Sequence, residues 1–122
     1  VESAKKNEPL IVHDNGSQTR VFCHVDDAVK AIKLLAGSKD SIGEVYNIGG
    51  VGEISINELA QKVISLTNSK SIIEYKSYAD VYGEDFEDMQ RRVPDIKKVT
   101  NQIGWSPSKG IEEIIRDVAA SN

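Results

Sequence analysis

The chain has 122 residues, of which 39% are hydrophobic, and a formal net charge of −4. These values predict one small domain with a modest core, and folding at this size buries only about two-thirds of the unfolded surface. The acidic balance argues against general binding of nucleic acid or of an anionic membrane, and no apolar run is long enough to span a bilayer. Cys23 is the single cysteine, so an intramolecular disulfide is excluded and a reducing, cytoplasmic setting is expected.

Two short strands are expected near the amino terminus, at Leu10–His13 and Arg20–His24. They flank the turn Asp14-Asn15-Gly16-Ser17, whose Asn-Gly pair favours the positive φ of a hairpin. The polar residues 1–8 that precede them look like the end of a helix. We therefore expect the chain to be a piece of a longer protein that begins in mid-helix.

A first helix is predicted over residues 25–36. Asp26 and Asp27 are its N-cap candidates, and Gly37 lies where helices often end. The apolar stripe that indicates this helix consists of Ala28, Ala31, Ile32 and Leu35. Glu44–Ile48, which runs into a glycine pair, is predicted to be the best strand of the chain.

The clearest helix is predicted over Ser55–Thr67, because Ser55-Ile56-Asn57-Glu58 is a capping box. A short β segment is expected at Ser71–Tyr75. The charged stretch Lys76–Val93 has no clear period and is predicted to be the most mobile part of the chain.

Two more helices are predicted beyond Pro94. The first is capped by Asp95 and ended by Gly104, and Trp105 behind it is expected to plug the core. The second covers Lys109–Ala120. Together the elements predict an α/β chain with about four helices and several short strands, rather than a complete doubly wound sheet.

The segment Gly16-Ser17-Gln18-Thr19-Arg20 is a candidate anion site. An arginine beside a glutamine and two hydroxyl groups can hold a phosphate, because guanidinium offers a planar fork and the neighbours add neutral donors. The alternative is an ordinary exposed turn.

The second candidate is Arg91-Arg92-Val93-Pro94-Asp95. Pro94 gives the adjacent arginines the rigid base that a bidentate clamp needs. The alternative is that the arginine pair only neutralises the preceding acidic residues, which are Glu84, Asp85, Glu87 and Asp88.

Metal binding and cofactor binding have little support in the sequence. His24 and Asp26 could share one face of a strand, but no further His or Cys cluster accompanies them, so no metal site is expected. Gly49-Gly50-Val51-Gly52 fits no phosphate-binding fingerprint, and no Tyr-x-x-x-Lys occurs. Cys23 is interpreted as a small core residue rather than a nucleophile.

Taken in order, these segments resemble the carboxy-terminal third of the extended short-chain dehydrogenase/reductase family, in its nucleotide-sugar modifying branch. The phrases that carry the resemblance are Gly16-Ser17-Gln18-Thr19-Arg20, Val25-Asp26-Asp27-Ala28-Val29, Gly43-Glu44-Val45-Tyr46-Asn47-Ile48-Gly49, Ile54-Ser55-Ile56-Asn57-Glu58-Leu59, Arg92-Val93-Pro94-Asp95 and Ile103-Gly104-Trp105-Ser106-Pro107. The match runs from about Glu8 to Val118, nearly the whole chain. His24 departs from it, because relatives often carry an aromatic residue there.

The resemblance implies a Rossmann-type fold and a division of labour. An amino-terminal domain would bind NAD and carry the catalytic residues, while residues 1–122 would form the part that binds the nucleotide diphosphate sugar. Arg20 and Arg92 would clamp the diphosphate, Gln18 would be a weaker candidate for the nucleotide, and Arg91 would replace Arg92 if the register differs by one. The parent enzyme would be a homodimer that epimerises, dehydrates or decarboxylates a nucleotide sugar, and the Arg-x-Pro-Asp phrase is somewhat closer to UDP-glucuronate decarboxylases. This chain alone would be inactive.

Two other classes of function stay open from the residues alone. The chain could be a binding module that holds a nucleotide without chemistry, or a purely structural or protein-interaction domain. A cofactor fingerprint and a Tyr-x-x-x-Lys motif encoded upstream of Val1 would favour the enzyme, whereas a start codon just before Val1 would favour the other two.

Overall fold

The structure is a computed structural model that describes residues 1–77 and 88–121. The chain divides into two compact units. The strand unit comprises residues 1–20, 53–92 and 115–122, and the helical unit comprises residues 21–52 and 93–114. Within the described ranges no helix is long and apolar enough to cross a membrane.

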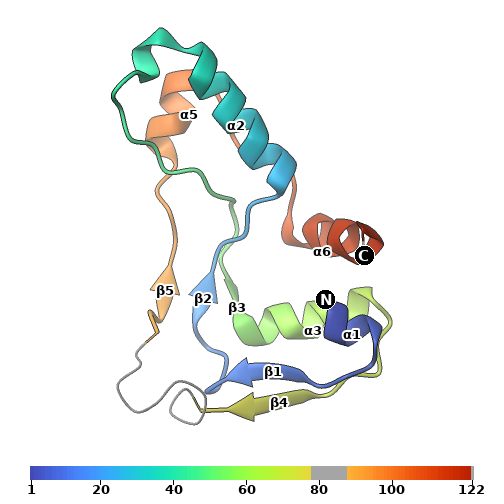
Figure 1. Cartoon of the computed structure of the whole chain (residues 1–122). Helices are drawn as coiled ribbons and strands as arrows, with labels where there is room; N and C mark the ends of the chain where they lie inside the picture. The colour runs from blue at the N-terminus through green and yellow to red at the C-terminus, as the bar shows by residue number, and fades with distance from the viewer. Residues whose placement is uncertain (78–87, 122) are drawn as a thin grey trace. The chain divides into compact units, whose positions relative to one another are not determined.

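The strand unit contains a parallel pair of strands and a separate three-stranded sheet (Figure 1). In the pair, β1 (Leu10–His13) runs parallel to β4 (Ile73–Lys76), with Leu10 opposite Ile73. In the other sheet the order is β3-β2-β5, formed by β3 (Ile54–Ser55), β2 (Thr19–Arg20) and β5 (Arg91–Arg92). The helices α1 (Glu2–Lys5) and α3 (Ile56–Leu66) belong to the same unit.

The predicted amino-terminal hairpin is wrong. The strand β1 pairs with β4, whereas β2 pairs with β3 and β5, so residues 14–17 connect two different sheets. Gly16 does adopt a positive φ of 67°, but a β-carbon there would lie 2.6 Å from Cγ1 of Val12, which is a core side chain. The Asn-Gly signal therefore marks a tight turn that folds back onto the core instead of a return to the same ladder.

The predicted helix at Ser55–Thr67 is confirmed as α3. The Ser55 hydroxyl accepts from the Glu58 backbone N–H at 3.1 Å, and the Glu58 carboxylate accepts from the Ser55 backbone N–H at 3.0 Å. Both groups of the capping box are therefore satisfied, and Ala60 and Val63 turn into the core. The β segment expected at Ser71–Tyr75 is also present, shifted to Ile73–Lys76.

The helical unit is organised around one buried tryptophan. It contains α2 (Val25–Gly37), the 3₁₀ turn η1 (Lys39–Ser41) and α5 (Lys97–Ile103), and the first residues of α6 (Ile111–Ser121) also belong to it. Trp105 is buried with Ala31 and Val99, as the sequence predicted, and its indole N–H donates to the Asp27 carbonyl oxygen at 3.0 Å. Cys23 packs against this cluster outside any strand, and burial raises the pKa of its thiol.

The helix at residues 25–36 is confirmed as α2, but its predicted caps are wrong. The N-cap is His24, whose Nδ1 accepts from the Asp26 backbone N–H at 3.1 Å. An imidazole nitrogen replaces the expected carboxylate, which leaves Asp27 free to accept hydrogen bonds from Ser108 and Lys109 instead.

The predicted strand at Glu44–Ile48 is also wrong, since it forms no ladder within the part of the chain that the structure describes. The alternation of its side chains is nevertheless present, because Tyr46 and Ile48 pack against the tryptophan cluster while Val45 is 81% exposed. A strand needs a hydrogen-bonded neighbour as well as this alternation, and no described segment supplies one.

The two later helices are confirmed as α5 and α6. The predicted cap of α5 is wrong, because Ile96 is the N-cap and Asp95 lies one residue before it, where its carboxylate accepts from the Lys97 backbone N–H at 2.9 Å. Gly104 ends that helix with a φ of 64°. In the stretch Lys76–Val93 both ends are strand, at Lys76 in β4 and at Arg91–Arg92 in β5. Its middle, residues 78–87, lies outside the described residues, so the predicted mobility of this stretch stays a prediction.

Candidate functional site

The pairing of β2 with β5 places the predicted arginines next to each other. The two strands run parallel, with Thr19 opposite Arg91 and Arg20 opposite Arg92. Because side chains alternate between the faces of a sheet, register partners share a face. Arg20 and Arg92, far apart in the sequence, therefore lie on one face, and Thr19 and Arg91 lie on the other.

Arg20 is held in a defined orientation. Its side chain is 17% exposed, its Nη1 donates to the Thr19 carbonyl oxygen at 2.8 Å, and its Nη2 lies 2.5 Å from Oδ2 of Asp88. A guanidinium has five N–H donors, so these two contacts do not use all of them. Asp88 shows that this guanidinium accommodates an anionic oxygen.

Arg92 and Arg91 differ in what they contact. Arg92 is exposed, and among the described residues its guanidinium has no hydrogen-bond or ion-pair partner. Arg91 is bound to Glu53 in a bidentate pair, with Nε to Oε1 at 2.9 Å and Nη2 to Oε2 at 2.9 Å. Of the two adjacent arginines, Arg92 is thus the one that shares a face with Arg20 and has its donors available.

Gln18 is buried immediately before β2. Its side chain is 5% exposed, and its amide Nε2 donates to the His13 carbonyl oxygen at 3.3 Å. The backbone carbonyl oxygen of Gln18 accepts from the Ile56 backbone N–H at 3.0 Å. In this geometry the Gln18 side chain, two positions before Arg20, is buried and hydrogen-bonded to the backbone, and its predicted contact with a nucleotide stays a prediction.

Sequence reasoning missed the carboxylates that hold these arginines. Arg91 was expected either to bind a ligand or to neutralise the acidic run before it, but it pairs with Glu53 instead. Asp88, from that acidic run, pairs with Arg20. The other acidic residues of the run, Glu84, Asp85 and Glu87, lie outside the described residues. Nothing in the spacing of Glu53 or Asp88 indicates these pairings, which depend on sheet register.

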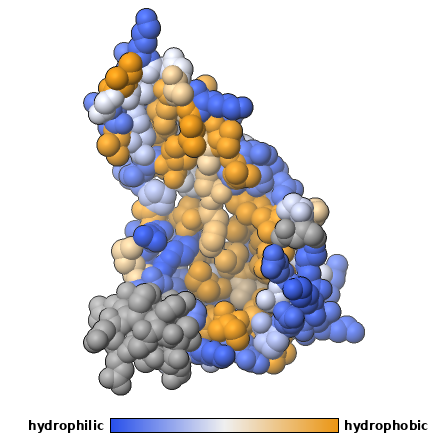
Figure 2. All heavy atoms as spheres, viewed as in Figure 1, coloured by the Kyte–Doolittle hydropathy of each residue, from blue (hydrophilic) through white to orange (hydrophobic). Residues whose placement is uncertain are grey.

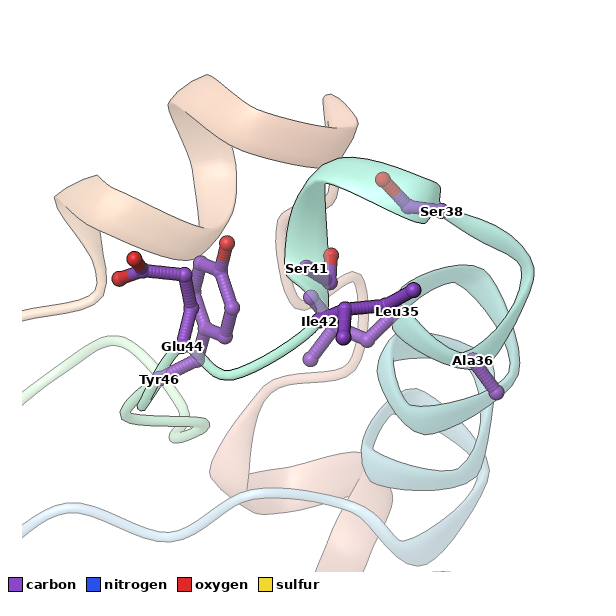
Figure 3. A pocket seen from close by; sticks show the side chains of 7 residues that line it. All are labelled: Leu35, Ala36, Ser38, Ser41, Ile42, Glu44 and Tyr46. Carbon is purple, nitrogen blue, oxygen red and sulfur yellow. The ribbon is translucent and has the colours of Figure 1, made fainter.

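A hollow of about 390 Å³ lies in the helical unit, and its lining is not that of an anion site (Figure 3). Leu35, Ile42 and Tyr46 line it with a few small residues, and Glu44 is the one charged side chain on its wall. No lysine or arginine is among the residues that line the hollow, so it does not suit the predicted phosphate ligand. Within the described ranges no group of His, Cys, Asp and Glu could hold a metal ion, and Asp26 does not join His24 in such a group.

The fold is that of a class of protein, the extended short-chain dehydrogenases that modify nucleotide sugars. The family model described as GDP-mannose 4,6 dehydratase matches residues 1–118. The chain therefore belongs to this family, as the sequence motifs predicted.

Similar proteins include decarboxylases of UDP-sugars. The chain is 34% identical over 117 residues to the UDP-N-acetyl-alpha-D-glucosaminuronate decarboxylase of Bacillus cytotoxicus, and the match covers 96% of this chain and 36% of that protein. It is 38% identical over 110 residues to UDP-glucuronic acid decarboxylase 1 of Danio rerio, covering 90% of this chain and 24% of that protein.

A solved structure shows the same fold. MoeE5 in complex with UDP-glucuronic acid and NAD superposes with a TM-score of 0.82 at 26% identity, over 99% of this chain and 40% of MoeE5. The chain thus spans between about a quarter and two-fifths of the length of these three proteins.

Proposed function

We propose that this chain forms the nucleotide-sugar-binding part of an NAD-dependent enzyme, and that Arg20 and Arg92 clamp the diphosphate of a UDP-sugar. The reaction belongs to the epimerase, dehydratase and decarboxylase group, and decarboxylation of a UDP-uronic acid is the form that the relatives favour. The observation that carries the proposal is the register of β2 and β5, which puts both guanidinium groups on one face of a sheet.

The clamp follows from elementary electrostatics. A diphosphate carries negative charge on both phosphoryl groups, and a guanidinium binds such oxygens through a planar fork. One arginine alone neutralises one charge, whereas two on the same face can grip both groups. Because the diphosphate is remote from the reacting sugar, this affinity positions the substrate without touching the chemistry.

The chemistry itself would come from a second, NAD-binding part. The sequence has neither a glycine-rich dinucleotide fingerprint nor a Tyr-x-x-x-Lys motif. Relatives that share this region are far longer than the chain. The NAD seen with MoeE5 would accordingly be bound by residues that this chain does not contain.

The helical unit has a surface suited to contact such a part. Val25, Val29 and Ile32 are 67%, 42% and 57% exposed, and their spacing puts them on one face of α2. Apolar side chains reach the molecular surface in the region where Figure 1 draws α2 (Figure 2). An exposed apolar helix face is a feature with which a unit docks on a neighbouring part of a protein.

The experiment measures UDP affinity by calorimetry in the whole protein as its gene encodes it. Arg20→Ala and Arg92→Ala should each weaken binding by roughly 1.5–3 kcal/mol, the range for hydrogen bonds to charged groups. Their effects should be non-additive because they share one ligand, and lysine should substitute poorly at either site.

Arg116→Ala is the matched control, because Arg116 is an exposed arginine of α6 outside the sheet. It should leave UDP affinity within about twofold of the wild-type value. Unchanged affinity in both Arg20→Ala and Arg92→Ala would refute the clamp.

A further inference from the structure

The strand that carries Arg92 is weakly held by its backbone. It is only two residues long, and among the described strands it pairs with β2 alone. The Thr19 backbone N–H also donates to the Gln90 carbonyl oxygen at 2.8 Å, just before the strand. Such a short edge pairing is marginal in water, so the position of Arg92 relative to Arg20 depends on additional contacts.

Glu53 supplies those contacts from the opposite side of the sheet. Its carboxylate binds Arg91 of β5 in the bidentate pair described above, and Oε1 also accepts a hydrogen bond from the Thr19 hydroxyl of β2. The hydrogen bonds from Arg91 and then from Thr19 lower the pKa of Glu53, which keeps it ionised at neutral pH. One carboxylate thus joins the two strands that present the arginine pair.

The position of Glu53 is fixed by the elements that follow it in the chain. Glu53 precedes β3, whose Ser55 is the N-cap of α3 in a complete capping box. β3 pairs with β2 through the register Thr19–Ser55 and Arg20–Ile54. A rigid helix end therefore sets the place of Glu53, and Glu53 in turn sets the place of Arg91.

We propose that Glu53 is a positioning residue for the diphosphate clamp, holding β5 against β2 so that Arg92 stands beside Arg20. The inference rests on the proposed function, since it assigns a support to the same site. Glu53 acts through Thr19 and Arg91, which lie on the face opposite the two clamp arginines, so it would not itself touch the ligand.

This role predicts a loss of affinity without a comparable loss of stability. An exposed ion pair contributes little to folding, and Arg91 is 66% exposed. A small shift of a two-residue strand, however, moves a guanidinium out of reach of the diphosphate. In the whole protein, Glu53→Gln should weaken UDP binding about fivefold while the melting temperature stays close to that of the wild type. Arg91→Gln removes the same contact from the other side and should have the same effect.

The matched control is Glu44→Gln, which breaks an exposed ion pair with Lys98 at 2.7 Å in the helical unit. It should leave UDP affinity unchanged. Uridine provides a second control, because it has no diphosphate: the Glu53→Gln and wild-type proteins should bind it equally, whereas general damage to the fold would weaken both ligands.

A double-mutant cycle separates this inference from the proposed function. If Glu53 acts through Arg92, the variant Glu53→Gln/Arg92→Ala should bind UDP within about twofold of Arg92→Ala alone. Additive losses, or normal affinity in Glu53→Gln and Arg91→Gln beside a weakened Arg92→Ala, would overturn the role of Glu53 and leave the clamp intact. Normal affinity in Arg20→Ala and Arg92→Ala would refute the clamp, and the role of Glu53 with it.

Discussion

Replacing Asp27 by alanine tests whether one buried carboxylate joins the start of α2 to the segment before α6. Asp27 is 4% exposed, and its Oδ2 accepts from the backbone N–H groups of Ser108 and Lys109, each at 3.0 Å. Its Oδ1 accepts from the Ser108 hydroxyl at 2.8 Å. All of these residues belong to the helical unit.

The expected loss of stability follows from these three hydrogen bonds. Bonds to a charged group contribute about 1.5–3 kcal/mol each, but they share one carboxylate and are not additive. Ser108 is exposed, so water can reach part of the space that a deleted side chain leaves. Asp27→Ala should therefore lower the free energy of unfolding by about 3 kcal/mol.

The same carboxylate should make stability depend on pH. Burial of Asp27 opposes its ionisation, but the hydrogen bonds from Lys109 and Ser108 outweigh burial and lower its pKa in the folded protein. A carboxyl whose pKa is lower when folded stabilises the protein above its unfolded pKa, about 3.9. This contribution is lost as the pH falls through the folded value, so wild-type stability should decline below about pH 4 more steeply than that of Asp27→Asn.

Urea unfolding of the wild type and Asp27→Ala at pH 7 measures the loss of stability. The same experiment on the wild type and Asp27→Asn across the acid range measures the pH dependence. Asp26→Ala is the neighbouring control, because the Asp26 side chain is 71% exposed and its pairing with Lys109 at 3.2 Å is a surface contact. It should cost less than about 1 kcal/mol. If Asp27→Ala costs no more than Asp26→Ala, the buried hydrogen bonds do not hold the two segments together and the reasoning fails.

Two further predictions concern α3 and the cofactor. Ser55→Ala should lower the free energy of unfolding by about 1 kcal/mol, because the hydroxyl that accepts from the Glu58 backbone N–H is lost. Thermal denaturation beside Ser65→Ala, which changes an exposed serine of the same helix, measures this, and equal melting temperatures would contradict it. The 122-residue chain alone should show no calorimetric binding of NAD and no turnover of a nucleotide sugar, since it has no cofactor fingerprint, and micromolar affinity for NAD would refute this.

Local patterns predicted the helices because helices are made by local contacts. The reciprocal bonds of Ser55 and Glu58 span three positions, and Gly104 takes up a left-handed conformation at the end of α5 without help from elsewhere. The sequence did not predict which residue caps α2. His24 is the N-cap, whereas Asp27 lies in the first turn and accepts hydrogen bonds from Ser108, a contact that is distant in the sequence.

Strand pairing was the part that local patterns could not supply. Alternating side chains made Glu44–Ile48 the most convincing strand, and the alternation is real, yet no described neighbour completes a ladder. The Asn-Gly turn gave a hairpin by the usual rule, but β1 pairs with β4 from a distant part of the chain. In both cases the missing information was the identity of a partner strand.

The choice between Arg91 and Arg92 depends on the same information. As neighbours in the sequence they are equivalent, and the family motif left a register difference of one residue open. A one-residue slip in a strand exchanges its two faces, so only the pairing with β2 decides which arginine accompanies Arg20. The bidentate contact between Arg91 and Glu53 disfavours that slip, because it would carry Arg91 away from its carboxylate. The Glu53 carboxylate thus binds Arg91 in the register in which Arg92, and not Arg91, shares a face with Arg20.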